Sequence, residues 1–295
     1  MIRPGLELTS PDKVMWPSTG FTKGQLLHYY ERVAPMLVPH LADRALTLGR
    51  FPAGVEQRGF AQTECRGRPE WMKSAPIRLR DGRVRSFCVV SDVSSLLWIA
   101  NLGTVELHTF LASVDALHQP KAALFDLDPE PPAGLGDACR VALLVRDRLA
   151  AEGLTAIVKT TGGAGLHVMV PLNCPHTYGE TRSFARRLAQ ELAQADGQVV
   201  ASATRREERQ GTVLIDWAQN SERRSFVVPY SLRATYVPLV SAPISWGEVE
   251  TGGAAPREAA RVAAGLLFGP VDVLDRVERQ GDLWERALNL VQRLG

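Results

Sequence analysis

The sequence predicts an α+β fold in which antiparallel or mixed β-sheets are flanked by helices. Segments with helical and with strand-like apolar spacing alternate along the chain. Residues 155–160 and 166–172 have strand composition and are joined by a short glycine-rich turn. Strands joined in this way must be antiparallel, because a parallel crossover needs about a dozen residues or more. A doubly wound parallel sheet is therefore not expected.

The first helix is expected over residues 22–38, where apolar side chains recur at helical spacing. Thr22 is a candidate N-cap for this helix. Pro35 is expected to kink or end it, because proline cannot donate the backbone hydrogen bond of a helix interior.

Two short runs and a second helix come next. The runs are residues 45–51 and 84–90, and the second, "VRSFCVV", has strand composition. The stretch "DVSSLLWIANLG" predicts a helix that Asp92 caps and Gly103 stops.

From residue 122 onward the pattern is clearer, because apolar runs and amphipathic runs follow one another closely. The expected strands are 122–129, 155–160, 166–172, 212–217 and 225–233, and the expected helices are 137–151 and 179–195. A loop rich in Gly, Ala and Pro is expected over 241–256.

The 295 residues are 45% hydrophobic, which suffices for a substantial core. A single domain is expected over residues 1–295. Its subregions are an N-terminal helical and strand part (1–120), a catalytic core (121–240) and a C-terminal helical tail (255–295).

Charge and cysteine content narrow the class of protein. Lys and Arg number 34 against 32 Asp and Glu, so a nucleic-acid partner would be held by local basic patches. The four cysteines fit neither a CxxC zinc site nor a dense disulfide framework, and reduced thiols are expected. The sequence shows no membrane span and no signal peptide, which predicts a cytoplasmic protein.

Three aspartates are candidate metal ligands. Asp126 and Asp128 lie two apart at the end of an apolar strand, so strand alternation points both to one face. Asp216 follows another apolar run, "VLI". Hard carboxylate oxygens favour Mg²⁺ or Mn²⁺. The alternative is that these acids are solvated strand ends.

The glycine turn "TTGGAGLH" lacks the GK[ST] of a P-loop, and a strand follows it instead of a helix. Its backbone N–H groups would suit a phosphate, with the hydroxyl of Thr160 or Thr161 and the ring of His167 alongside. An ordinary tight hairpin explains the same glycines, and His167 is equally compatible with a structural role. Arginines at 182, 186 and 187 are interpreted as a solvated helix face.

Several stretches together resemble one family. They include "SPDKVMWPSTGFTKGQLLHYYERVAPMLVPHL", "LWIANLGTVELHTF", "FDLDP", "TTGGAGLHVMVPL", "VLIDWAQN" and "VPYSLRA". In this order they are similar to the polymerase domain of bacterial DNA ligase D, a branch of the archaeo-eukaryotic primase superfamily. The resemblance covers nearly the whole chain and implies a primase-like catalytic core.

The resemblance also implies an activity. It is metal-dependent, template-directed nucleotide addition to gaps and ends of DNA in repair by non-homologous end joining. It implies two Mn²⁺ or Mg²⁺ ions, NTP or dNTP, and DNA with 5′-phosphates. The resemblance leads us to expect Ku and a separate DNA ligase as partners, and a location in the cytoplasm, at the nucleoid.

Site residues follow by position from the resemblance. The catalytic and metal-binding residues would be Asp126, Asp128 and Asp216. The nucleotide-binding residues would be His108, Thr161, Gly163, His167, Arg209 and Arg233. The DNA-binding residues would be Lys13, Lys23 and Phe60.

The chain departs from the family where lysine is usual, at Gly49, Thr63 and Ala164. Two of these positions, 49 and 164, belong to triphosphate binding in the resemblance. The alternative function is therefore a nucleic-acid-binding paralogue with weak or no polymerase activity. A haloacid-dehalogenase-type phosphatase shares the D-x-D motif, but here Pro129 and Glu130 follow it, which disfavours that class.

Overall fold

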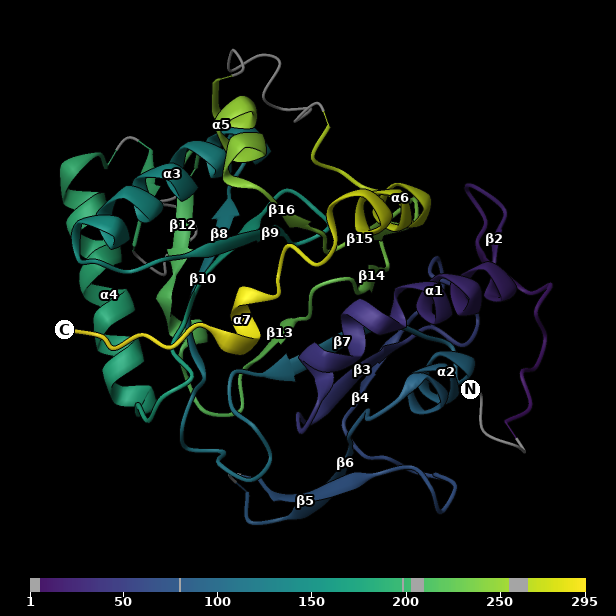
Figure 1. The fold of residues 1–295 in the computed structure, drawn as a ribbon. Helices are drawn as coiled ribbons and strands as arrows, with labels where there is room; N and C mark the ends of the chain where they lie inside the picture. Colours follow the sequence, from purple (N-terminus) through teal and green to yellow (C-terminus); the bar gives the residue numbers. More distant parts are fainter. Residues whose placement is uncertain (1–5, 80, 198, 203–209, 255–264) are drawn as a thin grey trace. The chain divides into compact units, whose positions relative to one another are not determined.

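The computed structural model describes residues 6–79, 81–197, 199–202, 210–254 and 265–295. The chain forms two compact units, each assembled from separate stretches (Figure 1). Unit 1 comprises Met1–Asp115, Ser225–Ser241 and Gly269–Asp282, and unit 2 comprises Ala116–Arg224, Ala242–Phe268 and Leu283–Gly295. The first division lies close to the break expected near residue 120, but 225–241 joins unit 1. The single primase/polymerase-like domain stays a prediction.

Unit 1 is built on an antiparallel sheet with the order β13-β7-β3-β6-β5, and β4 also pairs with β3. Its strands are β3 (Leu46–Arg50), β4 (Phe60–Gln62), β5 (Ser74–Arg78), β6 (Val84–Cys88), β7 (Thr104–Phe110) and β13 (Ser225–Val227). Two small antiparallel pairs complete the unit: β1 (Val14–Trp16) with β2 (Phe21–Thr22), and β14 (Leu232–Arg233) with β15 (Leu239–Val240).

The described residues of unit 1 form three helices: α1 (Lys23–Leu41), α2 (Val93–Asn101) and α6 (Pro270–Gln280). Thr22 caps α1 as predicted, since its hydroxyl accepts from the Gln25 N–H at 3.3 Å. Asp92 caps α2 in the same way, accepting from the Ser95 N–H at 2.8 Å. Pro35 does not end α1, which continues to Leu41.

Unit 2 contains a mixed sheet with the order β11-β12-β8-β10-β9-β16. Among its described strands only β11 and β12 pair in parallel. The strands are β8 (Ala122–Pro129), β9 (Ile157–Thr160), β10 (Leu166–Pro171), β11 (Val200–Ala201), β12 (Val213–Asp216) and β16 (Pro243–Ile244). The sheets and helices confirm the α+β prediction.

Helices cover this sheet. Both α3 (Leu135–Ala151) and α4 (Tyr178–Ala195) pack against β8 (Figure 1). The other helical elements among the described residues of unit 2 are α5 (Trp246–Ala254), α7 (Arg286–Asn289) and the short 3-10 turn η2 (Trp217–Gln219). In the described part of the chain, no helix has the length and apolarity that a bilayer crossing needs.

Three local predictions are wrong. The stretch 225–233 is not one strand, because Tyr230 takes a left-handed φ of 66° between β13 and β14. The stretch 241–256 is not a loop alone, since it contains β16 and α5. Cys65 and Cys88 are not reduced thiols but form a disulfide. That pairing joins residues 23 apart in sequence, which the spacing of the cysteines did not indicate.

Candidate active site

Four polar side chains form a row across the sheet of unit 2. Asp216 of β12 lies opposite Asp126 of β8, which lies opposite His167 of β10, which lies opposite Lys159 of β9. Directly opposed residues of antiparallel strands project to the same face. Asp128, two residues beyond Asp126, projects to that face as well. We call Asp216, Asp126, His167 and Lys159 the polar row.

The apolar composition of β8 explains why the acids lie at the end of this strand. Its residues Ala122 to Leu127 are buried, and Asp128 is the first exposed position. The apolar run therefore fixes the strand inside the sheet, and the carboxylates come at its end. The sequence prediction that Asp126 and Asp128 share a face agrees with this register.

Asp126 is buried, with 8% of its surface exposed. Burial alone would raise the pKa of this carboxyl. His167, Lys159 and Gln219 outweigh burial and lower the pKa below its ordinary value of 3.8. The His167 Nε2 atom lies 3.1 Å from Asp126 Oδ1, and Gln219 Nε2 donates to Asp126 Oδ2 at 3.3 Å. Asp126 is therefore an anion at neutral pH.

Lys159 is the site residue that sequence reasoning missed. It is fully buried, and its charge acts on Asp126. A buried lysine is rare unless it is paired, because desolvating an ammonium is costly. The available signal was a single charged residue inside the apolar strand "AIVKT", directly before the glycine turn.

The glycine turn lies against the end of β8. A Cβ atom on Gly165 would be 2.7 Å from the Leu127 carbonyl oxygen, so only glycine fits there. Gly162 takes a left-handed φ of 77°, a conformation that favours glycine. Thr161 closes the turn, because its N–H donates to the Gly165 carbonyl at 3.0 Å. Two of the three glycines thus serve the close approach of this turn to the aspartate strand.

The three aspartates suit a divalent cation by chemistry and register. Their carboxylates share one face at neighbouring strand ends, and the buried Asp126 Oδ1 accepts no hydrogen bond of good geometry from the described residues. As the side chains stand, the described residues contain no cluster of three or more His, Cys, Asp or Glu close enough to hold a metal ion. Asp216 Oδ1 instead accepts the Ala218 N–H at 2.9 Å. Cation binding would require these side chains to converge.

Unit 1 contains a second group of predicted residues, around Glu106. His108 Nε2 lies 3.0 Å from Glu106 Oε2, and Arg233 Nε lies 3.2 Å from Glu106 Oε1. The Ala234 N–H also donates to Glu106 at 3.0 Å. Burial would raise the pKa of Glu106, but the His108 hydrogen bond, the Arg233 charge and the Ala234 N–H together lower it to about 2. Glu106 thus holds in place His108 and Arg233, two of the residues predicted to bind the nucleotide.

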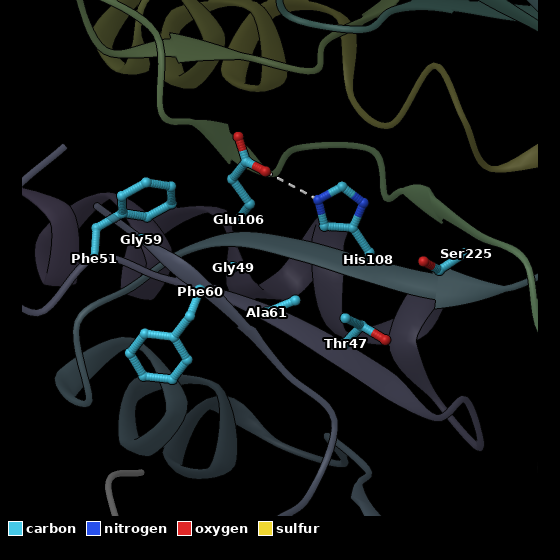
Figure 2. A pocket seen from close by; sticks show the side chains of 9 residues that line it. All are labelled: Thr47, Gly49, Phe51, Gly59, Phe60, Ala61, Glu106, His108 and Ser225. Atoms are coloured by element: carbon cyan, nitrogen blue, oxygen red, sulfur yellow. Dashed lines mark hydrogen bonds and ion pairs between the residues drawn. The ribbon is translucent and has the colours of Figure 1, made fainter. Parts of the chain in front are cut away.

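Glu106 and His108 border a pocket of about 340 Å³ (Figure 2). Its lining combines two aromatic rings, several small residues and the ion pair, namely Thr47, Gly49, Phe51, Gly59, Phe60, Ala61, Glu106, His108 and Ser225. Gly49 is packed under Glu106, because a Cβ atom there would lie 2.8 Å from Glu106 Cβ. The position where the resemblance implies lysine is therefore closed by Glu106.

The predicted DNA-binding residues also lie in unit 1. Lys23 is buried, and burial together with the nearby charge of Lys13 lowers its pKa. Two neighbouring cations of this kind favour an anion. Phe60 is half exposed on β4, and the Arg50 guanidinium lies 5.3 Å from its ring centroid.

Unit 2 thus brings together Asp126, Asp128, Asp216, Thr161 and His167, with Gly163 in the adjoining turn. Unit 1 brings together His108 and Arg233 and also contains Lys13, Lys23 and Phe60. Arg209 lies outside the described residues.

Comparison with known proteins identifies the family. The model of the LigD primase-polymerase domain matches residues 22–284, which is most of the chain. The chain belongs to the LigD primase-polymerase family.

Curated LigD proteins and a solved LigD structure support this assignment. The multifunctional non-homologous end joining DNA repair protein LigD of Mycobacterium tuberculosis is 35% identical over 288 residues, 95% of this chain. The bifunctional non-homologous end joining protein LigD of Bacillus subtilis is 27% identical over 281 residues. The chain spans 36% and 44% of the length of these two relatives. The solved polymerase domain of M. tuberculosis Ligase D, in complex with DNA, superimposes with a TM-score of 0.87 at 32% identity. That superposition covers 97% of this chain and 99% of the other.

The three departures from the LigD pattern have different surroundings. Gly49 is covered by Glu106, as described above. Thr63 accepts a hydrogen bond from Arg85 at 2.9 Å, so a guanidinium lies where the resemblance implies an ammonium. Ala164 is exposed on the glycine turn. Of these three positions, only 164 is exposed, so a longer side chain can be added there without displacing Glu106 or Arg85.

Proposed function

We propose that this chain is a metal-dependent, template-directed nucleotidyltransferase that fills gaps and processes ends of DNA in non-homologous end joining. Membership of the LigD primase-polymerase family supports a polymerase role, and the similar solved structure is a complex with DNA. The observation that carries the proposal is the common face of Asp126, Asp128 and Asp216 at adjoining strand ends.

The aspartates would hold two Mn²⁺ or Mg²⁺ ions. Bound there, such ions activate a 3′ hydroxyl and stabilise the charge of a nucleotide triphosphate. His167 and Lys159 keep Asp126 ionised and oriented toward the shared face. Thr161 and Gly163 present the turn to phosphate, and in unit 1 His108 and Arg233 are held by Glu106 as phosphate ligands.

The DNA would be recognised by its backbone and by an exposed ring. Lys13 and Lys23 suit the 5′-phosphate of a downstream strand, because an anion between them offsets their mutual repulsion. Phe60 suits stacking against a template base. We further propose action beside Ku and a separate DNA ligase, in the cytoplasm at the nucleoid.

Primer extension tests the proposal. The substrate is a gapped, 5′-phosphorylated duplex with labelled NTP and Mn²⁺, and the matched variant is Asp126→Asn with Asp128→Asn. We expect the double variant to lose activity by roughly a thousandfold, because metal-held transition-state charge is worth several kcal/mol. Equal product from wild type and variant at equal folded content would refute the polymerase function.

A nucleic-acid-binding paralogue with weak polymerisation is the second candidate. The observation that favours it is Gly49, because Glu106 lies so close to this position that a lysine there would displace it. The same assay separates the two functions, since a paralogue would bind the gapped duplex but add no nucleotide above the double-variant background.

A further inference from the structure

The helix α4 carries three arginines that differ in their partners. Arg187 pairs with Glu152 at 2.9 Å and with Glu191 at 3.0 Å, and these contacts raise its pKa. Arg182 and Arg186 make no ion pair with any described residue. Their guanidinium carbons lie instead 5.2 and 5.3 Å from the centre of the Trp217 ring. All three are exposed, in agreement with the solvated face expected from the sequence, but Arg182 and Arg186 also lie over an aromatic ring.

Two like charges four residues apart on a helix repel each other. Arg182 and Arg186 have this spacing, both are exposed, and both are drawn over the same indole. A guanidinium stacked on an aromatic face keeps its N–H edge available for bidentate contact with phosphate. The pair therefore presents two guanidinium edges that suit the oxygens of an anion such as phosphate.

The position of Trp217 connects this pair to the polar row. Trp217 follows Asp216 directly, and its Nε1 atom donates to the Ser202 carbonyl at 3.4 Å. Two residues further on, Gln219 donates to Asp126. The indole platform and the aspartates thus share one short segment of unit 2.

We propose that Arg182, Arg186 and Trp217 form a binding site for the sugar-phosphate backbone of a nucleic-acid strand, separate from Lys13, Lys23 and Phe60. Arg182 and Arg186 are four residues apart on α4, so their Cα atoms are about 6 Å apart along the helix axis. The pair offers one guanidinium group to each of two phosphates of a strand. The proposal rests on DNA being the substrate, but not on polymerisation.

Salt-dependent binding tests this site. The probe is a fluorescein-labelled gapped duplex with a 5′-phosphate, and anisotropy is measured without NTP or metal from 50 to 200 mM salt. We expect Arg182→Gln with Arg186→Gln to weaken binding and to reduce the log–log salt slope by about 2, since each lost phosphate contact contributes about 0.9. Arg182→Lys with Arg186→Lys keeps both charges and should retain the slope while binding more weakly.

The matched control is Arg286→Gln with Arg293→Gln, which removes two exposed arginines of the same unit that have no aromatic partner among these contacts. It should bind as wild type does. The proposal is overturned if the 182/186 glutamine variant, with an unchanged melting temperature, has the slope and affinity of this control. It is also overturned if poly-glutamate displaces the duplex as well as an oligonucleotide of equal charge.

The two proposals fail separately. A wild type that binds DNA with the expected slope but adds no nucleotide removes the polymerase function and leaves the arginine site. A wild type that extends primers, while the 182/186 glutamine variant binds like the control, removes the arginine site alone.

Discussion

The polar row of unit 2 and the Glu106 group of unit 1 combine acidic and basic side chains in different ways. In unit 1 one carboxylate is matched by His108, Arg233 and a backbone N–H, and Gly49 leaves room for it. In unit 2 three carboxylates face the same way, with one buried lysine and one histidine beside them. In the first group one carboxylate is bound by side chains and a backbone N–H of its own unit, whereas the second places three carboxylates on one face, a donor set that suits a divalent cation.

The largest expected effect on stability comes from breaking the polar row at Lys159. Lys159→Met leaves Asp126 buried with less positive charge, and removing one partner of a buried charged pair costs roughly 3 kcal/mol. Denaturant unfolding should show this loss. Lys121→Met, at an exposed position of unit 2, should leave the free energy of unfolding unchanged. A Lys159→Met protein as stable as that control would mean that Lys159 does not balance Asp126.

The next effect concerns the approach of the glycine turn to β8. Gly165→Ala places a Cβ atom 2.7 Å from the Leu127 carbonyl oxygen, so the turn or the strand must shift. Such overpacking costs about 1–3 kcal/mol. Gly163→Ala is the control in the same turn, because the nearest atom to its Cβ would be the Thr161 hydroxyl at 3.8 Å. Thermal unfolding of both variants should separate them clearly, and equal melting temperatures would contradict the close approach.

Glu106→Gln tests how much the charge of Glu106 contributes to the stability of the Glu106 group. Its folded pKa of about 2 lies below its ordinary value of 4.5. Ionised Glu106 therefore stabilises the fold above pH 4.5, and this stabilisation is lost as the pH falls toward 2. We expect the variant to be about 2 kcal/mol less stable at neutral pH, from its charge-assisted hydrogen bonds.

The pH series provides the check on Glu106. The difference between wild type and Glu106→Gln should shrink as the pH is lowered from 4.5 toward 2, whereas Glu56→Gln, at an exposed position, should match wild type throughout. A stability difference that stays constant over this range would show that the charge of Glu106 is not what holds the group.

Local patterns in the sequence predicted much of the fold and the common face of two of the three aspartates. Period-two alternation placed Asp126 and Asp128 on one face, and the caps at Thr22 and Asp92 fixed two helix starts. What local patterns could not supply is register between strands. The alignment of Lys159 and His167 with Asp126 depends on which residues of three strands pair. The Cys65–Cys88 disulfide and the contact of Gly49 with Glu106 are likewise non-local, so no spacing in the sequence encodes them.

The smallest expected effect is a gain at Ala164, where the polar row lies beside the one exposed departure from the family. Ala164→Lys adds a cation to an open position of the turn. One charge-assisted contact of about 1.5 kcal/mol would lower the KM for NTP about tenfold. Ala164→Gln, similar in reach but uncharged, should leave the KM unchanged.

Gly49→Lys adds a lysine in the pocket of unit 1 and is compared with Ala164→Lys in the glycine turn of unit 2. Its Cβ atom would meet Glu106 Cβ at 2.8 Å, so Glu106 must move away from His108 and Arg233 before any new cation is useful. We therefore expect Gly49→Lys to lower the melting temperature and to give little or no improvement in KM, alone or combined with Ala164→Lys. If Gly49→Lys improved KM without loss of stability while Ala164→Lys did nothing, the missing charge would belong to the pocket of unit 1, and the glycine turn would be a structural hairpin.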